Sequence, residues 1–290
     1  MFDNTNPAPL LSVVMPAHNA ERTIKTAARS TLMAMPANAE LLIFLDACTD
    51  RTRQELEAIH DKRLRIIEAT NQHGVAAALN ALLAQARGRL IARMDSDDIC
   101  LPWRFRSQLR KIAKTKADIL FGNAVLFGRS LLPFGLMPQF PIRLSPQQGA
   151  LALLLTNPFV HPSMIGTAAA MKVLGGYRET PAEDYDMWLR ASLAGMRMER
   201  SAGYAILYRV HDNQLTQQAA WKQKLQKDNS LFKTRADLAH ALLGFEIPLE
   251  SDLAIVSRAI WRDPRGGLIA KWLVFRALGV KATWQLLKTN

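Results

Sequence analysis

The sequence predicts an α/β fold, with a mainly parallel sheet flanked by helices and a helical C-terminal appendage. Short apolar runs alternate with helical segments through the first 94 residues. Acidic residues directly follow two of these runs, and the composition becomes polar and Lys-rich after about residue 215. Strand–helix alternation at this spacing is typical of right-handed βαβ units, whose strands lie parallel in one sheet.

Four strands, the first two of them buried, and three helices are expected in this first part. Continuous apolar runs suit parallel strands covered on both faces, and proline, glycine and capping residues mark the helix ends. The expected strands are residues 10–15, 41–45, 65–68 and 90–94, and the expected helices are residues 20–33, 53–60 and 75–86. Asp46 and Asp95 then stand at strand carboxyl ends, where such sheets bind ligands, so both acids should face one crevice.

The middle of the chain is less regular. We expect a strand at 118–127, a proline-broken loop at 134–141, an apolar helix at 145–155 and two extended pieces within 196–210. Glu183 and Asp184 open a further helix, because acids in a first turn interact favourably with the helix dipole. The main domain is expected to span residues 1–215 and the appendage residues 216–290.

Composition limits the partners and the compartment. A net charge of +12 and a pI near 10.0 call for an anionic partner. The sequence has no nucleic-acid-binding motif, so we expect phosphorylated ligands or a lipid surface and no nucleic acid. Cys48 and Cys100 form neither a disulfide framework nor a metal spacing. With no secretory signal pattern and no apolar run of about 18 residues, a cytoplasmic location is expected.

The basic C-terminal stretch has two interpretations. Residues 201–290 hold 13 Lys and Arg against 7 Asp and Glu. Lys271, Arg276 and Lys281 recur near Trp272 and Trp284, and such pairs suit the headgroup zone of a membrane. The charges do not gather on one helix face, as an interfacial helix requires. We predict peripheral contact with the anionic inner face of the cytoplasmic membrane, and the alternative is a helix packed on the main domain.

Three carboxylates follow the strand at 90–94: Asp95, Asp97 and Asp98. Like charges this close are costly unless a cation neutralises them. Mg²⁺ or Mn²⁺ is the expected partner, because hard divalent cations prefer oxygen ligands. The alternative is a solvated acidic turn in which Asp98 caps a helix starting near Pro102. The surrounding strand–helix order favours the metal site.

Ten separated motifs in a fixed order resemble bacterial family 2 glycosyltransferases. Members of that family have the Rossmann-like GT-A fold and are typically inverting and metal-dependent. The resemblance covers residues 10–216, about three quarters of the chain. The motifs are VVMPAHN at 13–19, LDACTDRT at 45–52, NQHG at 71–74, ALN at 78–80, GRLIARMDSDD at 88–98, NP at 157–158, HPS at 161–163, GGY at 175–177, EDYD at 183–186 and YRVH at 208–211.

The resemblance implies roles for individual residues. The second acid of the Glu-Asp pair, Asp184, would be the catalytic base, and Asp98, Glu183 and His161 would support the site. The metal ligands would be Asp95, Asp97 and His211, with Mg²⁺ or Mn²⁺ bound. The expected contacts to a nucleotide-sugar donor are Pro16, Ala17, His18, Asn19, Asp46, Asn71, Gly74, Asn80, Asp95 and Ser96.

The implied reaction moves a sugar, with inversion, from a nucleotide-diphosphate sugar to a hydroxyl acceptor. A UDP-sugar is the foremost donor, and a glycan or lipid-linked acceptor in cell-surface polysaccharide or glycolipid biosynthesis is expected. Because the chain offers one base and no enzyme nucleophile, a single displacement follows. The diphosphate leaving group gains charge that a divalent cation neutralises.

The motifs also depart from the family pattern. Leu45 stands where the family often has a first acid, Ala47 and Cys48 replace small Gly and Ser positions, and His18 replaces a Tyr. One rival function is a sugar-phosphate nucleotidyltransferase, but residues 16–19 do not form the Gly-rich phosphate loop it needs. A second rival is a non-catalytic nucleotide-sugar-binding protein, which the intact Asp97 and Asp184 disfavour.

Overall fold

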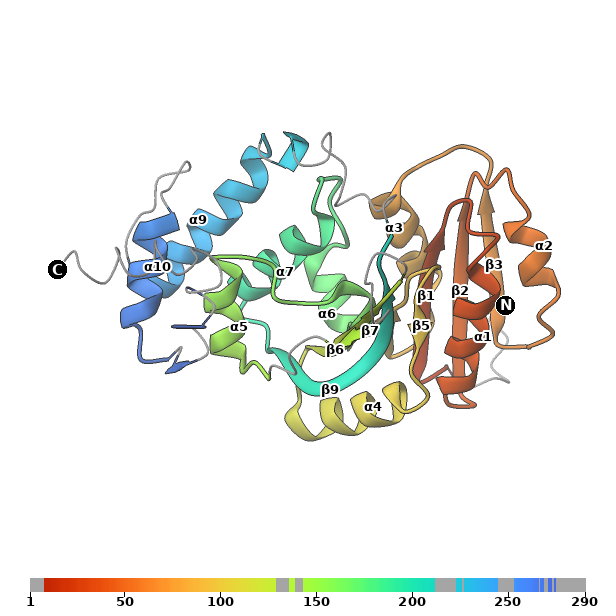
Figure 1. The fold of residues 1–290 in the computed structure, drawn as a ribbon, viewed down its shortest axis with the longest axis horizontal. Coiled ribbons are helices and arrows are strands. Elements are labelled where there is room, and N and C mark those ends of the chain that lie inside the picture. The colour runs from red at the N-terminus through yellow and green to blue at the C-terminus, as the bar shows by residue number, and fades with distance from the viewer. Residues whose placement is uncertain are drawn as a thin grey trace.

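A computed structural model gives the fold of the chain (Figure 1). The structure describes residues 8–128, 136–138, 143–211, 223–225, 227–244, 253–265, 267–268, 271–272 and 274.

The first part of the chain forms the predicted strand–helix alternation. Its elements are β1 (Leu11–Ala17), α1 (Ile24–Ala34), β2 (Ala39–Asp46), α2 (Thr52–Glu57), β3 (Leu64–Ala69), α3 (Val75–Gln85) and β4 (Leu90–Arg93). Strand β1 pairs in parallel with both β2 and β4, and β2 pairs in parallel with β3. The predicted βαβ units are therefore confirmed.

The second part adds antiparallel strands, so the sheet is mixed although many of its pairings are parallel. Its strands are β5 (Ile99–Cys100), β6 (Ile119–Phe127), β7 (Leu136–Pro138), β8 (Ile165–Thr167) and β9 (Met198–Arg209). The strand order is β3-β2-β1-β4-β8-β6-β9-β5, and β7 pairs with β6. Strand β8 is antiparallel to both β4 and β6, whereas β9 runs parallel to β6.

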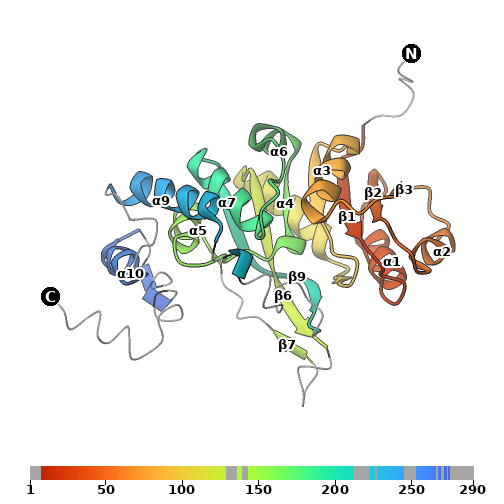
Figure 2. The same ribbon diagram turned by 90° about the horizontal axis from the view of Figure 1, so that it is seen from above.

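Helices cover both faces of the sheet (Figure 2). Side chains alternate along each strand, so Val14 and Phe44 pack in the core under α3, while Val13 and Ile43 pack in the core under α1. The remaining helices are α4 (Arg104–Thr115), α5 (Pro146–Leu153), the short 3₁₀ turn η2 (His161–Ser163), α6 (Ala168–Leu174), α7 (Glu183–Leu193), α9 (Asn229–Leu243) and α10 (Leu253–Arg262).

The C-terminal helices share a core with the rest of the protein. Helix α9 packs against α7, and both it and α10 lie at the end of the molecule opposite α1 and α2 (Figure 1). Leu231, Leu238 and Ile260 are buried in the same hydrophobic cluster as Trp188 of α7. The predicted boundary at 215/216 lies outside the described residues. Among the described residues, no helix has the length and apolar composition needed to cross a bilayer.

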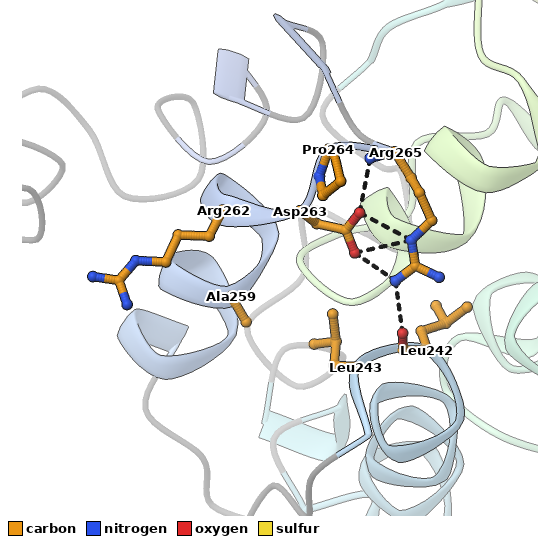
Figure 3. A pocket seen from close by; sticks show the side chains of 7 residues that line it. All are labelled: Leu242, Leu243, Ala259, Arg262, Asp263, Pro264 and Arg265. Atoms are coloured by element: carbon orange, nitrogen blue, oxygen red, sulfur yellow. Dashed lines mark hydrogen bonds and ion pairs between the residues drawn. The ribbon is translucent and has the colours of Figure 1, made fainter.

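A shallow pocket of about 330 Å³ lies between the ends of α9 and α10 (Figure 3). The Arg265 guanidinium spans it, since Nε donates to Asp263 Oδ1 at 2.9 Å and Nη2 donates to the Leu242 carbonyl at 2.7 Å. This contact fastens the turn after α10 to the last turn of α9. The pocket lining is Leu242, Leu243, Ala259, Arg262, Asp263, Pro264 and Arg265.

Two local predictions are wrong, and the capping role that the disfavoured alternative gave Asp98 is also not found. Residues 136–138, expected within a loop, pair with β6 as strand β7. The two pieces expected within 196–210 are one strand, β9, whose register against β6 shifts on either side of Asn123. Helix α4 begins at Arg104, and Asp98 does not cap it, because Asp98 Oδ1 accepts a hydrogen bond from the Arg209 amide at 2.8 Å.

Candidate active site

The carboxyl ends of β1 and β2 carry two loops that are tied together. Asp46, the last residue of β2, accepts the His73 amide at 2.8 Å on Oδ1 and the Gly74 amide at 2.9 Å on Oδ2. Gly74 has φ 85° and starts α3, so the Asp46 carboxylate fixes the entry to that helix. Asn71 is exposed at the start of the same loop.

The loop after β1 is held against the loop after β2. The His18 ring nitrogen Nδ1 lies 2.5 Å from the Asp46 carbonyl, and the Asn19 side chain accepts the Thr49 amide at 2.9 Å. His18 and Asn19 are exposed, whereas Pro16 and Ala17 belong to β1 itself. The structure therefore brings the predicted donor-contact residues from the first three motifs to one edge of the sheet.

The acids after β4 converge as predicted. Asp95, Asp97 and Asp98 each offer a carboxylate oxygen within 4.8 Å of the other two. Asp98 is buried, and among the described residues its Oδ2 has no hydrogen-bond partner. Burial, with the Asp97 charge beside it, raises the pKa of Asp98 well above its usual value. A buried carboxylate oxygen without a donor, next to two more carboxylates, fits a hard divalent cation. Ser96, between the acids, is half-buried.

The end of β9 closes this cluster from the other side. His211 Nε2 lies 3.1 Å from Asp97 Oδ2, 114 positions away in the sequence. Arg209 Nε donates to the Asp97 carbonyl at 2.7 Å, and the Arg209 amide holds Asp98. The predicted grouping of His211 with the acids is therefore present, and Arg209 is an anchor that the sequence did not single out.

Arg93 is a second residue that sequence analysis did not include in the site. Its side chain is 6% exposed and forms an ion pair with Asp95. The Arg93 amide donates to the Met164 carbonyl at 3.1 Å, and Arg104 Nη2 donates to the Arg93 carbonyl at 2.7 Å. The one available signal was a cation at the end of an otherwise apolar strand. Asp95 is thus shared between the acid cluster and a buried guanidinium.

The predicted base lies at the start of α7. Asp184 accepts the Asn157 side-chain amide on Oδ2 at 2.8 Å and the Tyr185 amide on Oδ1 at 2.7 Å. Burial raises the pKa of Asp184. Burial, with the Asp184 charge beside it, raises the pKa of Glu183 to about 7. Asn157, known from the sequence only as part of a motif, orients the Asp184 carboxylate.

Both groups of acids belong to one electrostatic site. Burial raises the pKa of Tyr208 to about 12, and the charges of Asp98, Asp97 and Asp184 add to that shift. The Arg93 charge acts against the rise in the pKa of Asp98, Glu183 and Asp184. The Tyr208 phenol and the Arg93 guanidinium therefore interact electrostatically with carboxylates at the end of β4 and on α7. The sheet joins the two regions through β8, which pairs with β4.

His161 is buried and Asn80 is half-buried, and both contact Tyr177. His161 Nε2 lies 2.9 Å from the Tyr177 hydroxyl, and burial lowers the pKa of His161 well below its usual value. Trp188 is fully buried and meets the His161 ring edge-on at 5.6 Å. Asn80, predicted to contact the donor, instead uses both atoms of its amide on the Tyr177 backbone, each at 2.8 Å.

Comparison with known proteins identifies the family. Residues 12–173 match the model of the family described as Glycosyl transferase family 2. The chain is 31% identical to the putative glycosyltransferase EpsE of Bacillus subtilis over 72% of this chain and 75% of that protein. The chain belongs to glycosyltransferase family 2. The matched segment contains the acids after β4, whereas Glu183, Asp184 and His211 lie beyond it.

A further relative agrees with this assignment, and a solved structure shares the fold. The chain is 36% identical, over 39% of its length and 45% of the relative's, to the Escherichia coli UDP-Glc:alpha-D-GlcNAc-diphosphoundecaprenol beta-1,3-glucosyltransferase WfgD. A crystal structure of S. aureus TarS 1-349 in complex with UDP-GlcNAc has a TM-score of 0.61 at 17% identity, covering 97% of this chain and 76% of that chain. The predicted GT-A fold is confirmed, and this glycosyltransferase has relatives named for polysaccharide and glycolipid synthesis.

Proposed function

We propose that this glycosyltransferase moves a sugar, with inversion, from a UDP-sugar to a hydroxyl of a glycan or lipid-linked acceptor in cell-surface polysaccharide or glycolipid synthesis. The observation that carries the proposal is the convergence of three carboxylates after β4 in the same electrostatic site as Asp184. WfgD is named for a UDP-Glc donor and a diphosphoundecaprenol-linked acceptor, which supports these substrate classes.

Mg²⁺ or Mn²⁺ would be held by Asp95, Asp97 and His211, with Asp98 behind them. The unpartnered, buried Asp98 oxygen and the His211–Asp97 contact support this ligand set. Support also comes from the mannosyltransferase PcManGT of Pyrobaculum calidifontis in complex with GDP-Man and Mn²⁺, which has a TM-score of 0.61 at 17% identity and covers 97% of this chain and 79% of that chain. When bound, the cation supplies positive charge for a departing diphosphate.

The donor nucleotide would lie along the carboxyl edge of β1, β2 and β4. Asp46 fixes the loop that presents Asn71 and Gly74, while His18 and Asn19 join the neighbouring loop to it. These contacts form a rigid rim from three loops, which suits recognition of a base and ribose at a sheet edge. Asp95 and Ser96 would complete the contacts. The rim residues taken from the motifs are Pro16, Ala17, His18, Asn19, Asp46, Asn71, Gly74, Asp95 and Ser96.

Asp184 would take the proton from the acceptor hydroxyl. The acceptor oxygen then forms its bond to the anomeric carbon as the bond from that carbon to the diphosphate oxygen breaks, so the configuration inverts. A carboxylate with a raised pKa is a stronger base, and general-base catalysis typically contributes ~10²–10⁴-fold. Asn157 holds the Asp184 carboxylate in one orientation through its 2.8 Å hydrogen bond.

Two variants test the proposal against Asp237→Asn, which alters an exposed carboxylate on α9. Asp184→Asn should bind UDP and Mn²⁺ like the wild type, while kcat falls by at least about two orders of magnitude. Asp97→Asn should lose most Mn²⁺-dependent UDP binding in calorimetry. NMR of the glycoside should show the anomer opposite to that of the donor.

Four results would overturn these assignments. Full activity of Asp97→Asn with chelator present would remove the metal site, and full activity of Asp184→Asn would remove the base. A product that retains the donor's anomeric configuration would remove the single displacement. Tight UDP-sugar binding with neither transfer nor donor hydrolysis would restore the non-catalytic alternative.

We also propose peripheral attachment to the cytoplasmic face of the membrane, where a lipid-linked acceptor is found. Leu268 is 85% exposed and Trp272 is 37% exposed, beside the cation Lys271. Lys271 Nζ lies 5.6 Å from the centre of the Trp261 ring, so one predicted cation also contacts α10. Arg276, Lys281 and Trp284 lie outside the described residues.

A further inference from the structure

The turn between α6 and α7 is held in place by hydrogen bonds to its backbone. Asn80 of α3 donates from Nδ2 to the Tyr177 carbonyl and accepts the Tyr177 amide on Oδ1, both at 2.8 Å. Gly176 has φ 81°, and a Cβ there would lie 2.4 Å from Asn80 Oδ1. Only glycine allows this approach, so the contact between the ALN and GGY motifs is specific.

The opposite side of the same turn is tied to α7. Arg190 donates from Nη1 to the Leu174 carbonyl at 2.6 Å and from Nη2 to the Gly176 carbonyl at 2.9 Å. Its Nε donates to the fully buried Asp186 at 2.7 Å. The backbone at residues 174–177 is therefore fixed from α3 and from α7. A turn fixed on two sides places the Tyr177 side chain in one position.

The Tyr177 side chain transmits this position to His161. Both residues are buried, and the Tyr177 hydroxyl lies 2.9 Å from His161 Nε2. Burial raises the pKa of Tyr177 and lowers the pKa of His161, so the phenol keeps its proton and the ring is neutral. The phenol then donates to Nε2, which leaves the ring hydrogen on Nδ1. That nitrogen faces Glu183 Oε1 at 3.9 Å.

We propose that Asn80, Tyr177 and His161 are positioning residues for the acid pair Glu183–Asp184, and that Asn80 does not bind the donor nucleotide. The inference rests on the proposed role of Asp184 as the base. The Asn80 amide uses one N–H and one lone pair on the Tyr177 backbone, which fixes its side chain against the turn. At 3.9 Å, His161 Nδ1 is too far from Glu183 Oε1 for a hydrogen bond, so His161 acts on the pair as a buried polar neighbour whose N–H dipole lies next to a carboxylate.

Tyr177→Phe is the sharpest variant, because it removes one hydroxyl and keeps the ring and the backbone contacts. We expect kcat to fall about tenfold, the rate equivalent of one hydrogen bond, with unchanged KM for the donor and unchanged UDP affinity. The acid limb of the kcat–pH profile should move to higher pH. Tyr204→Phe on β9 is the matched control and should leave kcat and the kcat–pH profile unchanged.

The pH profile reports on several groups that surround the acid pair. Neither Tyr177→Phe nor Tyr204→Phe replaces Arg93 or His161. The Asp184 charge contributes to the raised pKa of Tyr208 on β9. The charged or titratable groups around the pair are Arg93 of β4, His161 of η2, Tyr177 of the fixed turn and Tyr208 of β9.

Asn80→Asp is an independent test of the positioning role. It keeps the side-chain shape and replaces the N–H group that donates to the Tyr177 carbonyl with an acceptor oxygen. We expect a lower kcat, again with unchanged calorimetric UDP affinity in the presence of Mn²⁺. A melting curve identifies loss of folding. ¹⁵N-histidine NMR, tractable because the chain has 6 His, should show His161 as the neutral Nδ1–H form in the wild type and a mixture in Tyr177→Phe.

The outcomes separate this inference from the proposed function. A fall in UDP affinity for Asn80→Asp with normal kcat would make Asn80 a donor contact and overturn the inference. So would wild-type kcat, pH profile and His161 tautomer in Tyr177→Phe, provided that Asp184→Asn is inactive. Full activity of Asp184→Asn would instead overturn the base assignment on which the inference rests.

Discussion

Replacing Glu183 with Gln should change how stability depends on pH. The Glu183 side chain is 14% exposed, and burial together with Asp184 raises its pKa from 4.5 to about 7. Between these two values the folded protein keeps a proton that the unfolded chain has released. The free energy of unfolding therefore decreases as pH rises through this window, and the stabilisation is complete only below the unfolded pKa.

The size of the effect follows from the same two values. At about 1.4 kcal/mol per pH unit, the interval from 4.5 to about 7 corresponds to at most about 3 kcal/mol. Glu183→Gln cannot ionise and also removes the repulsion on Asp184. Relative to the wild type, the variant should therefore gain up to about 3 kcal/mol between about pH 4.5 and pH 7.5.

Urea unfolding at several pH values measures this difference. His161 acts in the opposite sense, since its lowered pKa favours the folded state as pH rises, but it is present in both proteins and cancels in the comparison. Glu179→Gln, at an exposed position four residues earlier, controls for the loss of a carboxylate. A constant stability gap between the wild type and Glu183→Gln across the range would refute the assigned burial and coupling.

Further predictions concern the metal side and the C-terminal surface. His211→Ala should weaken Mn²⁺ binding about tenfold in calorimetry, as expected when a ligand or its support is lost, and should leave metal-free UDP binding unchanged. An equal Mn²⁺ affinity would remove His211 from the ligand set. The protein should co-sediment with anionic vesicles at low salt and separate from them at high salt. Two altered proteins should bind the vesicles much less: the double variant that combines Leu268→Ser with Trp272→Ser, and a chain that ends near Pro264. Equal sedimentation of all three would leave this surface as structure only.

The donor side of the fold was predictable because its information is local. Strands β1 and β2 are largely apolar runs, and the alternation of strands β1 to β4 with helices predicts parallel pairing and a common carboxyl edge. The acid cluster after β4 follows from that edge. Where the prediction failed, pairing decided the structure: Pro138 is compatible with β7 because an edge strand does not need every backbone donor. Residues 201–203 look like a break in the sequence yet lie within β9.

The contacts that complete the site are distant in sequence. Arg209 and His211 reach Asp97 across more than 110 positions, and Asn80 reaches Tyr177 across 97. No spacing rule indicates such pairs. The motif resemblance grouped His211 with the acids and implied that Asn80 contacts the nucleotide sugar, whereas the contact of Asn80 with the Tyr177 backbone could not be predicted. Arg93 was overlooked although its ion-pair partner Asp95 is close in sequence, because the burial of its side chain depends on elements that are distant in sequence, such as β8.

The antiparallel strand β8 joins the donor side of the sheet, which ends at β4, to the side that begins at β6. It enters between β4 and β6, and the Arg93 amide bonds to Met164 immediately before it. Arg104 Nη2 then clamps the carbonyls of Arg93 and Met164 at 2.7 and 3.2 Å. His161 therefore stands next to the end of the strand that carries the metal-site acids. The Arg93 charge thus acts on the donor-side acids and on the α7 acids, and a change at this junction would alter both sides together.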